Sequence, residues 1–249
     1  LRLHNRRVPG FQFEDRCRSF VRQLQQSWDG RTGLFDHGPH VKTVSKGEHT
    51  IFTVMISCTA RRQVREATLN RLRRTDWKRA PDVTVLDEST DEDPRVRQTE
   101  TALIALTRGL ESGADYVLFL EDDLRFNRHL AHNLRRWPPL RAGRVTLASL
   151  YNPGVKELAC DVAGNALLVE PSAVFGSQAL LISRATLAVI TSHWRKVPGM
   201  QDIRIARLAG RLKRPVLYHA PSLVQHAGEV STWGGGHHRA PDFDVRWRA

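Results

Sequence analysis

Cysteine is scarce in this 249-residue chain, which contains only Cys17, Cys58 and Cys160. An odd number of widely separated cysteines argues against a disulfide framework and against a zinc cluster, and it favours a reducing compartment. The sequence also has no run of 18 apolar residues, so it predicts no membrane-spanning helix. We therefore expect a cytoplasmic protein. The start at Leu1 rather than Met leaves open a removed targeting segment or membrane anchor.

Two glycine-rich phosphate-binding motifs are missing as well. No G-x-G-x-x-G follows the first predicted strand and no G-x-x-x-x-G-K-[ST] occurs in the chain, which disfavours a dinucleotide-binding fold and a P-loop. The segment after that strand, residues 57–62, has no glycine, unlike the corresponding loop of nucleotidyltransferases. A bound nucleotide would therefore need another partner for its phosphates, such as a divalent cation held by carboxylates.

Positive charge exceeds negative charge, with 38 Lys and Arg against 26 Asp and Glu and a formal net charge of +12. Such a balance attracts polyanions or an anionic membrane surface, so peripheral membrane contact stays open. The arginines are nevertheless spread along the chain, and no zinc finger, RNA-binding aromatic signature or dense basic helix is present. The pattern favours a solvated basic surface over dedicated nucleic-acid binding.

Strand and helix patterns alternate in the middle of the chain. Apolar, β-branched segments at 51–56, 83–86 and 117–120 are separated by helical patterns at 63–74 and 98–112. This order predicts an α/β fold with a Rossmann-like, mostly parallel central sheet flanked by helices. Further elements are expected as helices at 128–137, 184–194 and 202–212 and as strands at 145–150, 178–182 and 216–218.

These patterns divide the chain into three parts. Residues 1–49 read as an accessory helix and arm, residues 50–227 as the α/β domain, and residues 228–249, rich in Gly and His, as a flexible tail. A hydrophobic content of 41% is sufficient for a packed core in the α/β domain.

The most informative segment runs from Val117 to Asp123. Four apolar residues are followed directly by Glu121, Asp122 and Asp123, which places three carboxylates at the end of a strand buried on both faces. Ligands of open α/β sheets bind at that edge, and adjacent carboxylates suit Mg²⁺ or Mn²⁺. A solvated turn that begins a helix explains the same triplet, because acidic residues are favoured in first helical turns.

Several short motifs carry a resemblance to one enzyme family. The Glu-Asp-Asp triplet resembles the variant Asp-x-Asp motif of N-acetylglucosaminyltransferases with the glycosyltransferase A fold. Three further segments are similar to the N-acetylglucosaminyltransferase IV family, namely Val96-Arg97-Gln98 with the following helix, Phe175-Gly176-Ser177-Gln178, and Pro221-Ser222-Leu223-Val224-Gln225-His226-Ala227-Gly228 with Ser231 and Asp242-Phe243 in step.

This resemblance implies roles for individual residues. Asp123 and His226 would bind the cation, and Glu121 and Asp122 would contact the ribose or the hydration shell of the cation. Asp202, at a predicted helix start, would be the general base, a position where an ordinary helix cap is the alternative. The remaining candidates for contacts with the nucleotide are Thr59, Arg61, Asp87 and Arg97.

The resemblance makes residues 50–227 the catalytic domain of a metal-dependent, inverting glycosyltransferase. The cofactor would be Mn²⁺ or Mg²⁺, the donor a UDP-sugar, with N-acetylglucosamine as one candidate sugar, and the acceptor a hydroxyl group of a glycan or another molecule. A non-catalytic, basic α/β protein that binds polyanions is the alternative function, favoured by the net charge of +12.

Overall fold

A computed structural model describes residues 49–86, 93–154, 159–162, 165–174, 176–228 and 239–249. The expected accessory helix and arm therefore lie outside the described residues, apart from residue 49. The α/β domain is built around one eight-stranded sheet with the strand order β2-β1-β3-β8-β5-β9-β7-β6, and a small two-stranded sheet joins β10 to β4. No helix in the described ranges is long and apolar enough to cross a membrane.

The expected fold class is confirmed, with a parallel core that is widened by antiparallel strands. Strand β1 pairs in parallel with β2 and β3, while β8 lies antiparallel between β3 and β5. Six of the eight strands share one direction, and β7 and β8 run against it. The strands are β1 (Ile51–Cys58), β2 (Asp82–Leu86), β3 (Tyr116–Leu120), β4 (Leu124–Phe126), β5 (Leu147–Ser149), β6 (Ala159–Val162), β7 (Ala166–Val169), β8 (Ala179–Ser183), β9 (Val216–His219) and β10 (Val224–His226).

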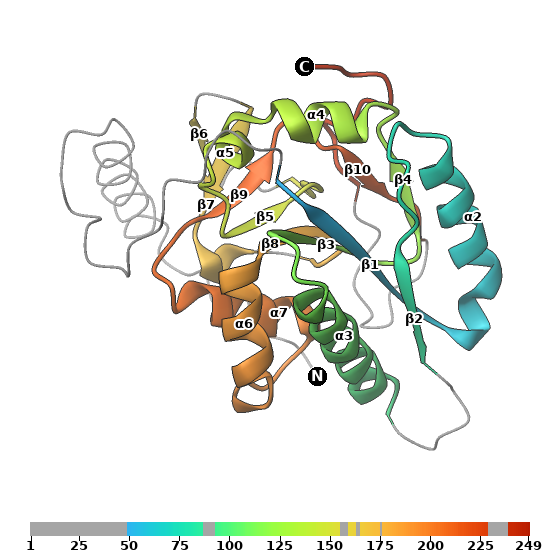
Figure 1. Cartoon of the computed structure of the whole chain (residues 1–249), viewed down its shortest axis with the longest axis vertical. Coiled ribbons are helices and arrows are strands. Elements are labelled where there is room, and N and C mark those ends of the chain that lie inside the picture. The colour runs from blue at the N-terminus through green and yellow to red at the C-terminus, as the bar shows by residue number, and fades with distance from the viewer. Residues whose placement is uncertain (1–48, 87–92, 155–158, 163–164, 175, 229–238) are drawn as a thin grey trace, which may run out of the picture. The chain divides into compact units, whose positions relative to one another are not determined.

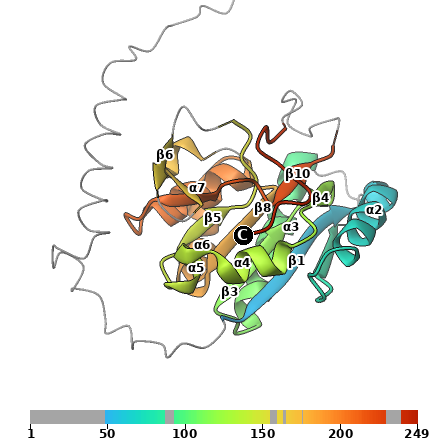
Figure 2. The same ribbon diagram turned by 90° about the horizontal axis from the view of Figure 1, so that it is seen from above.

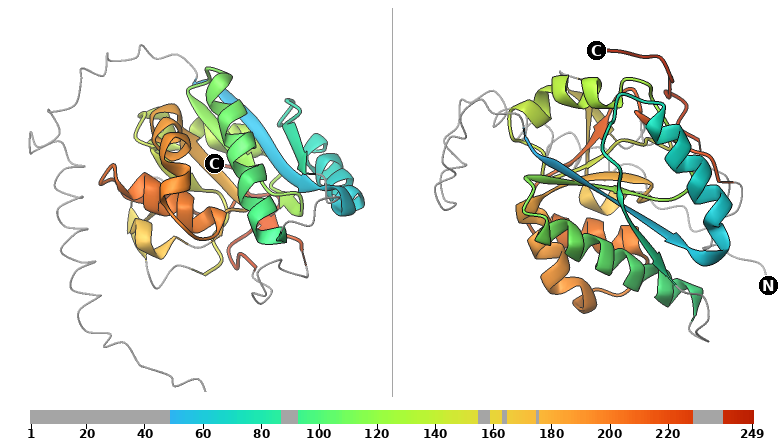
Figure 3. Two further views of the ribbon diagram at one scale, coloured as in Figure 1. Left: turned by 90° about the horizontal axis from the view of Figure 1, so that it is seen from below. Right: turned by 45° about the vertical axis from the view of Figure 1, so that its right-hand side comes forward.

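Helices cover both faces of the sheet (Figures 1 and 3). Helices α3, α6 and α7 pack together on one face, where their apolar side chains meet those of β1, β3, β8 and β9 in the main core. Helices α4 and α5 lie on the opposite face (Figure 3). The helices are η1 (Thr59–Arg61), α2 (Arg62–Arg73), α3 (Pro94–Glu111), α4 (Leu130–Arg136), α5 (Pro138–Arg141), η3 (Pro171–Ala173), α6 (Arg184–His193), η4 (Trp194–Lys196) and α7 (Gln201–Gly210).

Strand β3 is the most deeply buried element of the sheet. Its residues Val117, Leu118, Phe119 and Leu120 are all 0% exposed. Each such side chain stabilises the fold by roughly 1.5–3 kcal/mol. Helix α3 approaches this strand so closely that a Cβ atom on Gly109 would collide with Val117. The end of β3, where the three carboxylates begin, is consequently fixed in position.

Some element boundaries differ from the sequence prediction. Helix α3 begins at Pro94 rather than at residue 98, because Pro is well tolerated in the first helical position and the Asp93 side chain caps the helix by accepting from the Arg95 N–H at 2.8 Å. Strands β4, β6, β7 and β10 were not predicted, because three or four residues carry too little periodicity.

The expected flexible tail also needs a correction. Its residues 239–249 pack on the α/β domain, where the Asn127 Nδ2 donates to the carbonyl oxygens of Asp244 and Trp247 at 2.7 and 2.8 Å. The N–H of Ala249 donates to Asn133 in α4 at 2.9 Å, and Figure 2 shows the chain end beside this helix. Residues 229–238 of the expected tail lie outside the described residues.

A buried histidine lies where this segment meets the sheet. His219, at the end of β9, is 1% exposed and contacts the rings of Trp137 and Trp247, with centroids 5.0 and 5.6 Å away. Its Nδ1–H donates to the Pro221 carbonyl oxygen at 2.7 Å. Burial outweighs this hydrogen bond and lowers the pKa of His219 to about 4.

We expect His219 to make the fold sensitive to acid. The unfolded chain protonates this residue below about pH 6.5 and the folded protein only near pH 4, so stability falls between these values. The loss over the whole range is about 3.5 kcal/mol, at roughly 1.4 kcal/mol for each of about 2.5 pH units. Urea unfolding of wild type and His219→Asn at pH 7 and pH 4.5 measures it. The variant should lose less stability on acidification; equal losses would contradict this account.

Candidate metal centre

The three carboxylates occupy the turn between β3 and β4, and α2 holds the backbone of this turn. The Thr68 Oγ1 donates to the Asp122 carbonyl oxygen at 2.6 Å and accepts from the Leu124 N–H at 3.1 Å. At the start of the turn, the Glu121 N–H donates at 2.9 Å to the carbonyl oxygen of Gln178, the residue before β8. The carboxylates are thus part of a hydrogen-bonded turn rather than the first turn of a helix, and the second interpretation of the triplet is wrong.

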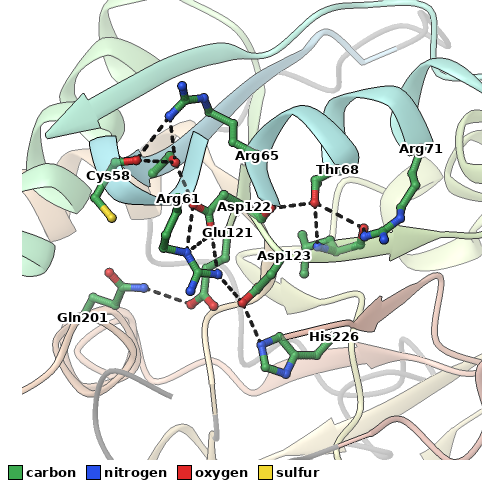
Figure 4. A network of polar contacts seen from close by, with 12 residues as sticks. Cys58, Arg61, Arg65, Thr68, Arg71, Glu121, Asp122, Asp123, Gln201 and His226 are labelled. Atoms are coloured by element: carbon green, nitrogen blue, oxygen red, sulfur yellow. Dashed lines mark hydrogen bonds and ion pairs between the residues drawn. The ribbon is translucent and has the colours of Figure 1, made fainter. Parts of the chain in front are cut away.

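Asp122 faces protein donors and is 5% exposed. Its carboxylate accepts from the Ser57 Oγ at 2.6 Å and from the Arg61 Nε at 2.8 Å (Figure 4). The Arg65 Nη1 donates to the same Ser57 hydroxyl at 3.1 Å. Burial raises the pKa of Asp122 despite the neighbouring guanidinium of Arg61.

Arg61 links two of the carboxylates. It belongs to η1, directly after β1, and its Nη2 lies 2.8 Å from Asp122 and 2.6 Å from Asp123. A planar guanidinium binds carboxylates through several donors at once, which makes it a strong partner for adjacent acids. The Arg61 side chain is 32% exposed, so it stands at the border between the acidic site and solvent.

Asp123 is also paired with His226, because β4 and β10 are antiparallel neighbours. Their register places His226 opposite Leu124, and the His226 Nε2 lies 3.2 Å from the Asp123 Oδ2. Burial opposes the charged forms of both groups. The hydrogen bond and charge of the pair outweigh it, lowering the pKa of Asp123, with help from Arg61, and raising that of His226.

Glu121 has a different set of partners. Its Oε1 accepts from the Ser177 Oγ at 2.8 Å and from the Gln201 Nε2 at 3.0 Å, and Gln201 also donates to the Ser177 hydroxyl at 2.8 Å. Burial first, and then the charge of Asp123, raise the pKa of Glu121 to about 7. When Glu121 is ionised, the three carboxylates outnumber their two cationic partners Arg61 and His226, and a nearby cation would relieve this excess of negative charge.

Glu121, Asp123 and His226 together could hold a metal ion. One ligand atom from each lies within 4.8 Å of the others. Two further observations fit a cation. The Asp123 Oδ1 is buried with no hydrogen-bond partner among the described groups, and a Cβ atom on Gly228 would collide with Asp123 and His226, so only glycine lets the backbone approach these two groups so closely. Carboxylate oxygens with one imidazole nitrogen are a donor set for a divalent cation.

Two other predicted site residues, Asp202 and Thr59, form hydrogen bonds to the backbone. Asp202 is in the first turn of α7, one residue after Gln201, and accepts from the N–H groups of Ile203 and Gly176 at 2.8 and 3.3 Å. Met200, not Asp202, occupies the N-cap of this helix. Thr59 donates to the Leu86 carbonyl oxygen at 3.1 Å and is exposed.

The last two residues that were predicted to contact the nucleotide are Arg97, in α3, and Asp87, which follows β2. Arg97 is half-buried in the first turns of α3. Asp87 lies outside the described residues, directly after β2.

Several residues of the centre were not singled out from the sequence. Ser177 belongs to the segment Phe175-Gly176-Ser177-Gln178, and Gln201 directly precedes Asp202, so both lie at places where the sequence carried a signal. Glu121 was expected to contact the ribose or the hydration shell of the cation, whereas in the structure it belongs to the group that could hold the cation itself. Ser57, on β1, carried no signal, because a serine at a strand end is common.

Comparisons with known proteins add little to this geometry. No protein-family model matches the chain, and no curated protein is significantly similar to it. Among solved structures, the chain is similar to the crystal structure of A197 from STIV, with 15% identity, a TM-score of 0.46, and coverage of 80% of this chain and 97% of that chain. The chemistry of the site is therefore argued from its own residues.

Proposed function

We propose that the protein is a metal-dependent, inverting glycosyltransferase of the glycosyltransferase A class. It would transfer a sugar, with N-acetylglucosamine as one candidate, from a UDP-sugar to an acceptor hydroxyl. The observation that carries this proposal is the group of Glu121, Asp123 and His226 at the carboxyl edge of the parallel strands β1 and β3. Ligands of open α/β sheets bind at this edge.

In this proposal Glu121, Asp123 and His226 hold Mn²⁺ or Mg²⁺. When bound, the cation would offset the negative charge of the nucleotide diphosphate, which this chain needs because it has no glycine-rich phosphate loop. Arg61 stands beside the same carboxylates with a third of its side chain exposed, which suits a second positive group for the diphosphate.

Asp202 is the proposed general base. Its carboxylate is half-buried on α7, next in sequence to Gln201, which donates to Glu121. Asp202 also accepts from the Gly176 N–H, next to Ser177, which donates to Glu121, and this supports a role for Asp202 near the acidic centre. There it would accept the proton of the acceptor hydroxyl while that oxygen attacks the anomeric carbon, so that the configuration inverts. Thr59, Arg97 and Asp87 would contact the nucleotide.

The first test concerns cation-dependent binding of UDP. Asp123→Asn removes one ligand charge at nearly constant size. We expect it to weaken Mn²⁺-dependent UDP binding at least about tenfold in calorimetry, a loss of about 1.4 kcal/mol or more. Asp115→Asn is the matched control, because Asp115 accepts from Thr50 at the other end of β3.

Two outcomes would count against this assignment. Unchanged UDP affinity in Asp123→Asn with Mn²⁺ present would remove Asp123 from the cation site. Wild-type binding of polyanions that needs no cation and weakens steeply with salt, without joint stabilisation by UDP and Mn²⁺ in thermal unfolding, would favour the polyanion-binding alternative.

The second test separates catalysis from binding. Asp202→Asn retains one oxygen that can accept from the Ile203 N–H at the start of α7 and loses only the longer contact with the Gly176 N–H, so the melting temperature should fall at most slightly. It removes the proton acceptor, and loss of a general base typically lowers the rate by about 10²–10⁴. Transfer assays and UDP calorimetry measure the two effects. A rate within about threefold of wild type, or a product with retained configuration, would refute the role of Asp202.

A further inference from the structure

Tyr151 is a buried tyrosine beside the candidate metal centre that the proposed chemistry does not yet use. It lies two residues after β5, whose carboxyl end is at the same edge of the sheet as that of β3. Its ring is edge-on to the imidazole of His226, with the centroids 6.4 Å apart. The side chain therefore packs directly against one of the three groups that could hold the cation.

The backbone of Tyr151 is held firmly. The Ser149 Oγ donates to the Tyr151 carbonyl oxygen at 2.7 Å and accepts from the Tyr151 N–H at 3.2 Å. The neighbouring Asn152 N–H donates to the Ser222 Oγ at 3.0 Å, and the Leu150 carbonyl oxygen accepts from the Leu223 and Val224 N–H groups at 2.9 and 3.0 Å. A side chain on so rigid a segment cannot easily turn toward another partner.

The hydroxyl of Tyr151 nevertheless has no hydrogen-bond partner among the described groups, although the residue is 1% exposed. An unpaired buried hydroxyl costs about 1–3 kcal/mol, so native proteins keep few of them. Burial first, and then the negative charges of Glu121 and Asp123, raise the pKa of this phenol. Tyr151 therefore stays a neutral hydrogen-bond donor within the influence of these two negative charges, and no described group lies within hydrogen-bonding distance of its hydroxyl.

We propose that the Tyr151 hydroxyl donates a hydrogen bond to a phosphate oxygen of the ligand that binds beside the cation. The ring contact puts Tyr151 beside His226, one of the three groups that could hold the cation, and its buried hydroxyl has no partner among the described groups. A neutral donor is suited to this place, since it adds affinity for phosphate without competing with the cation for the carboxylates. The inference rests on the proposed function, because the phosphate reaches the site with the nucleotide.

Tyr151→Phe tests this assignment, since it removes only the hydroxyl. Loss of a hydrogen bond to a charged group should weaken UDP binding in the presence of Mn²⁺ by about 10- to 100-fold. Binding of inorganic pyrophosphate with Mn²⁺ should weaken by a similar factor, whereas binding of Mn²⁺ alone should change by less than about twofold. The melting temperature without ligand should stay equal or rise, because an unpaired buried hydroxyl is removed. Tyr116→Phe, at the far end of β3 and 4% exposed, is the matched control.

The outcomes separate this inference from the proposed function. Wild-type protein that binds UDP with Mn²⁺, together with a Tyr151→Phe variant that binds it within about twofold, would overturn the role of Tyr151 alone. A lower melting temperature with equal weakening of Mn²⁺ and UDP binding would also overturn it, because the hydroxyl would then support the fold. Wild-type protein that does not bind UDP with Mn²⁺ would contradict the proposed function and this inference together. A pyrophosphate affinity that is unchanged while UDP binding weakens would place the hydroxyl on the nucleoside and overturn the phosphate contact.

Discussion

Mutual repulsion of three adjacent carboxylates at the buried end of β3 is the constraint on which the candidate site depends. Asp122 and Asp123 are each 5% exposed, and water cannot stabilise their charges there. Arg61 and a protonated His226 supply two positive charges against three ionised carboxylates, which leaves one negative charge in excess among these groups. Burial and the charge of Asp123 raise the pKa of Glu121 to about 7. A divalent cation bound by Glu121, Asp123 and His226 would remove the excess, which is why the electrostatics favour a cation-binding role.

The fold brings these compensating groups together from distant parts of the chain. Arg61 follows β1, His226 ends β10, and Gln201 begins α7, yet all three reach carboxylates in the turn after β3. The antiparallel pair of β4 and β10 is the element that places the imidazole, because its register fixes which side chains face each other. Gly228 lets the backbone pass close to Asp123 and His226, where a side chain would collide with both.

Much of the fold could be predicted from the sequence because its central elements carry strong local signals. The apolar run of β3 and the helical period of α2 are clear in isolation, and the acidic triplet marks the edge where the site lies. The antiparallel direction of β8 could not be predicted, since a short apolar strand has the same pattern in either direction. The roles of Ser57, Ser177 and Tyr151 depend on contacts between distant segments, and single residues of these types carry no signal of their own.

The central claim is that one cation is bound jointly by Glu121, Asp123 and His226. Electron spin-echo envelope modulation of Mn²⁺ bound to the protein tests it most directly, because the ¹⁴N nucleus of a coordinating imidazole modulates the echo. The account predicts ¹⁴N modulation in wild type and its loss in His226→Gln. His132→Gln is the control, because it removes a half-buried imidazole that lies 3.0 Å from the Ala249 carbonyl oxygen. A wild-type spectrum without ¹⁴N modulation, or modulation that persists in His226→Gln, would contradict it.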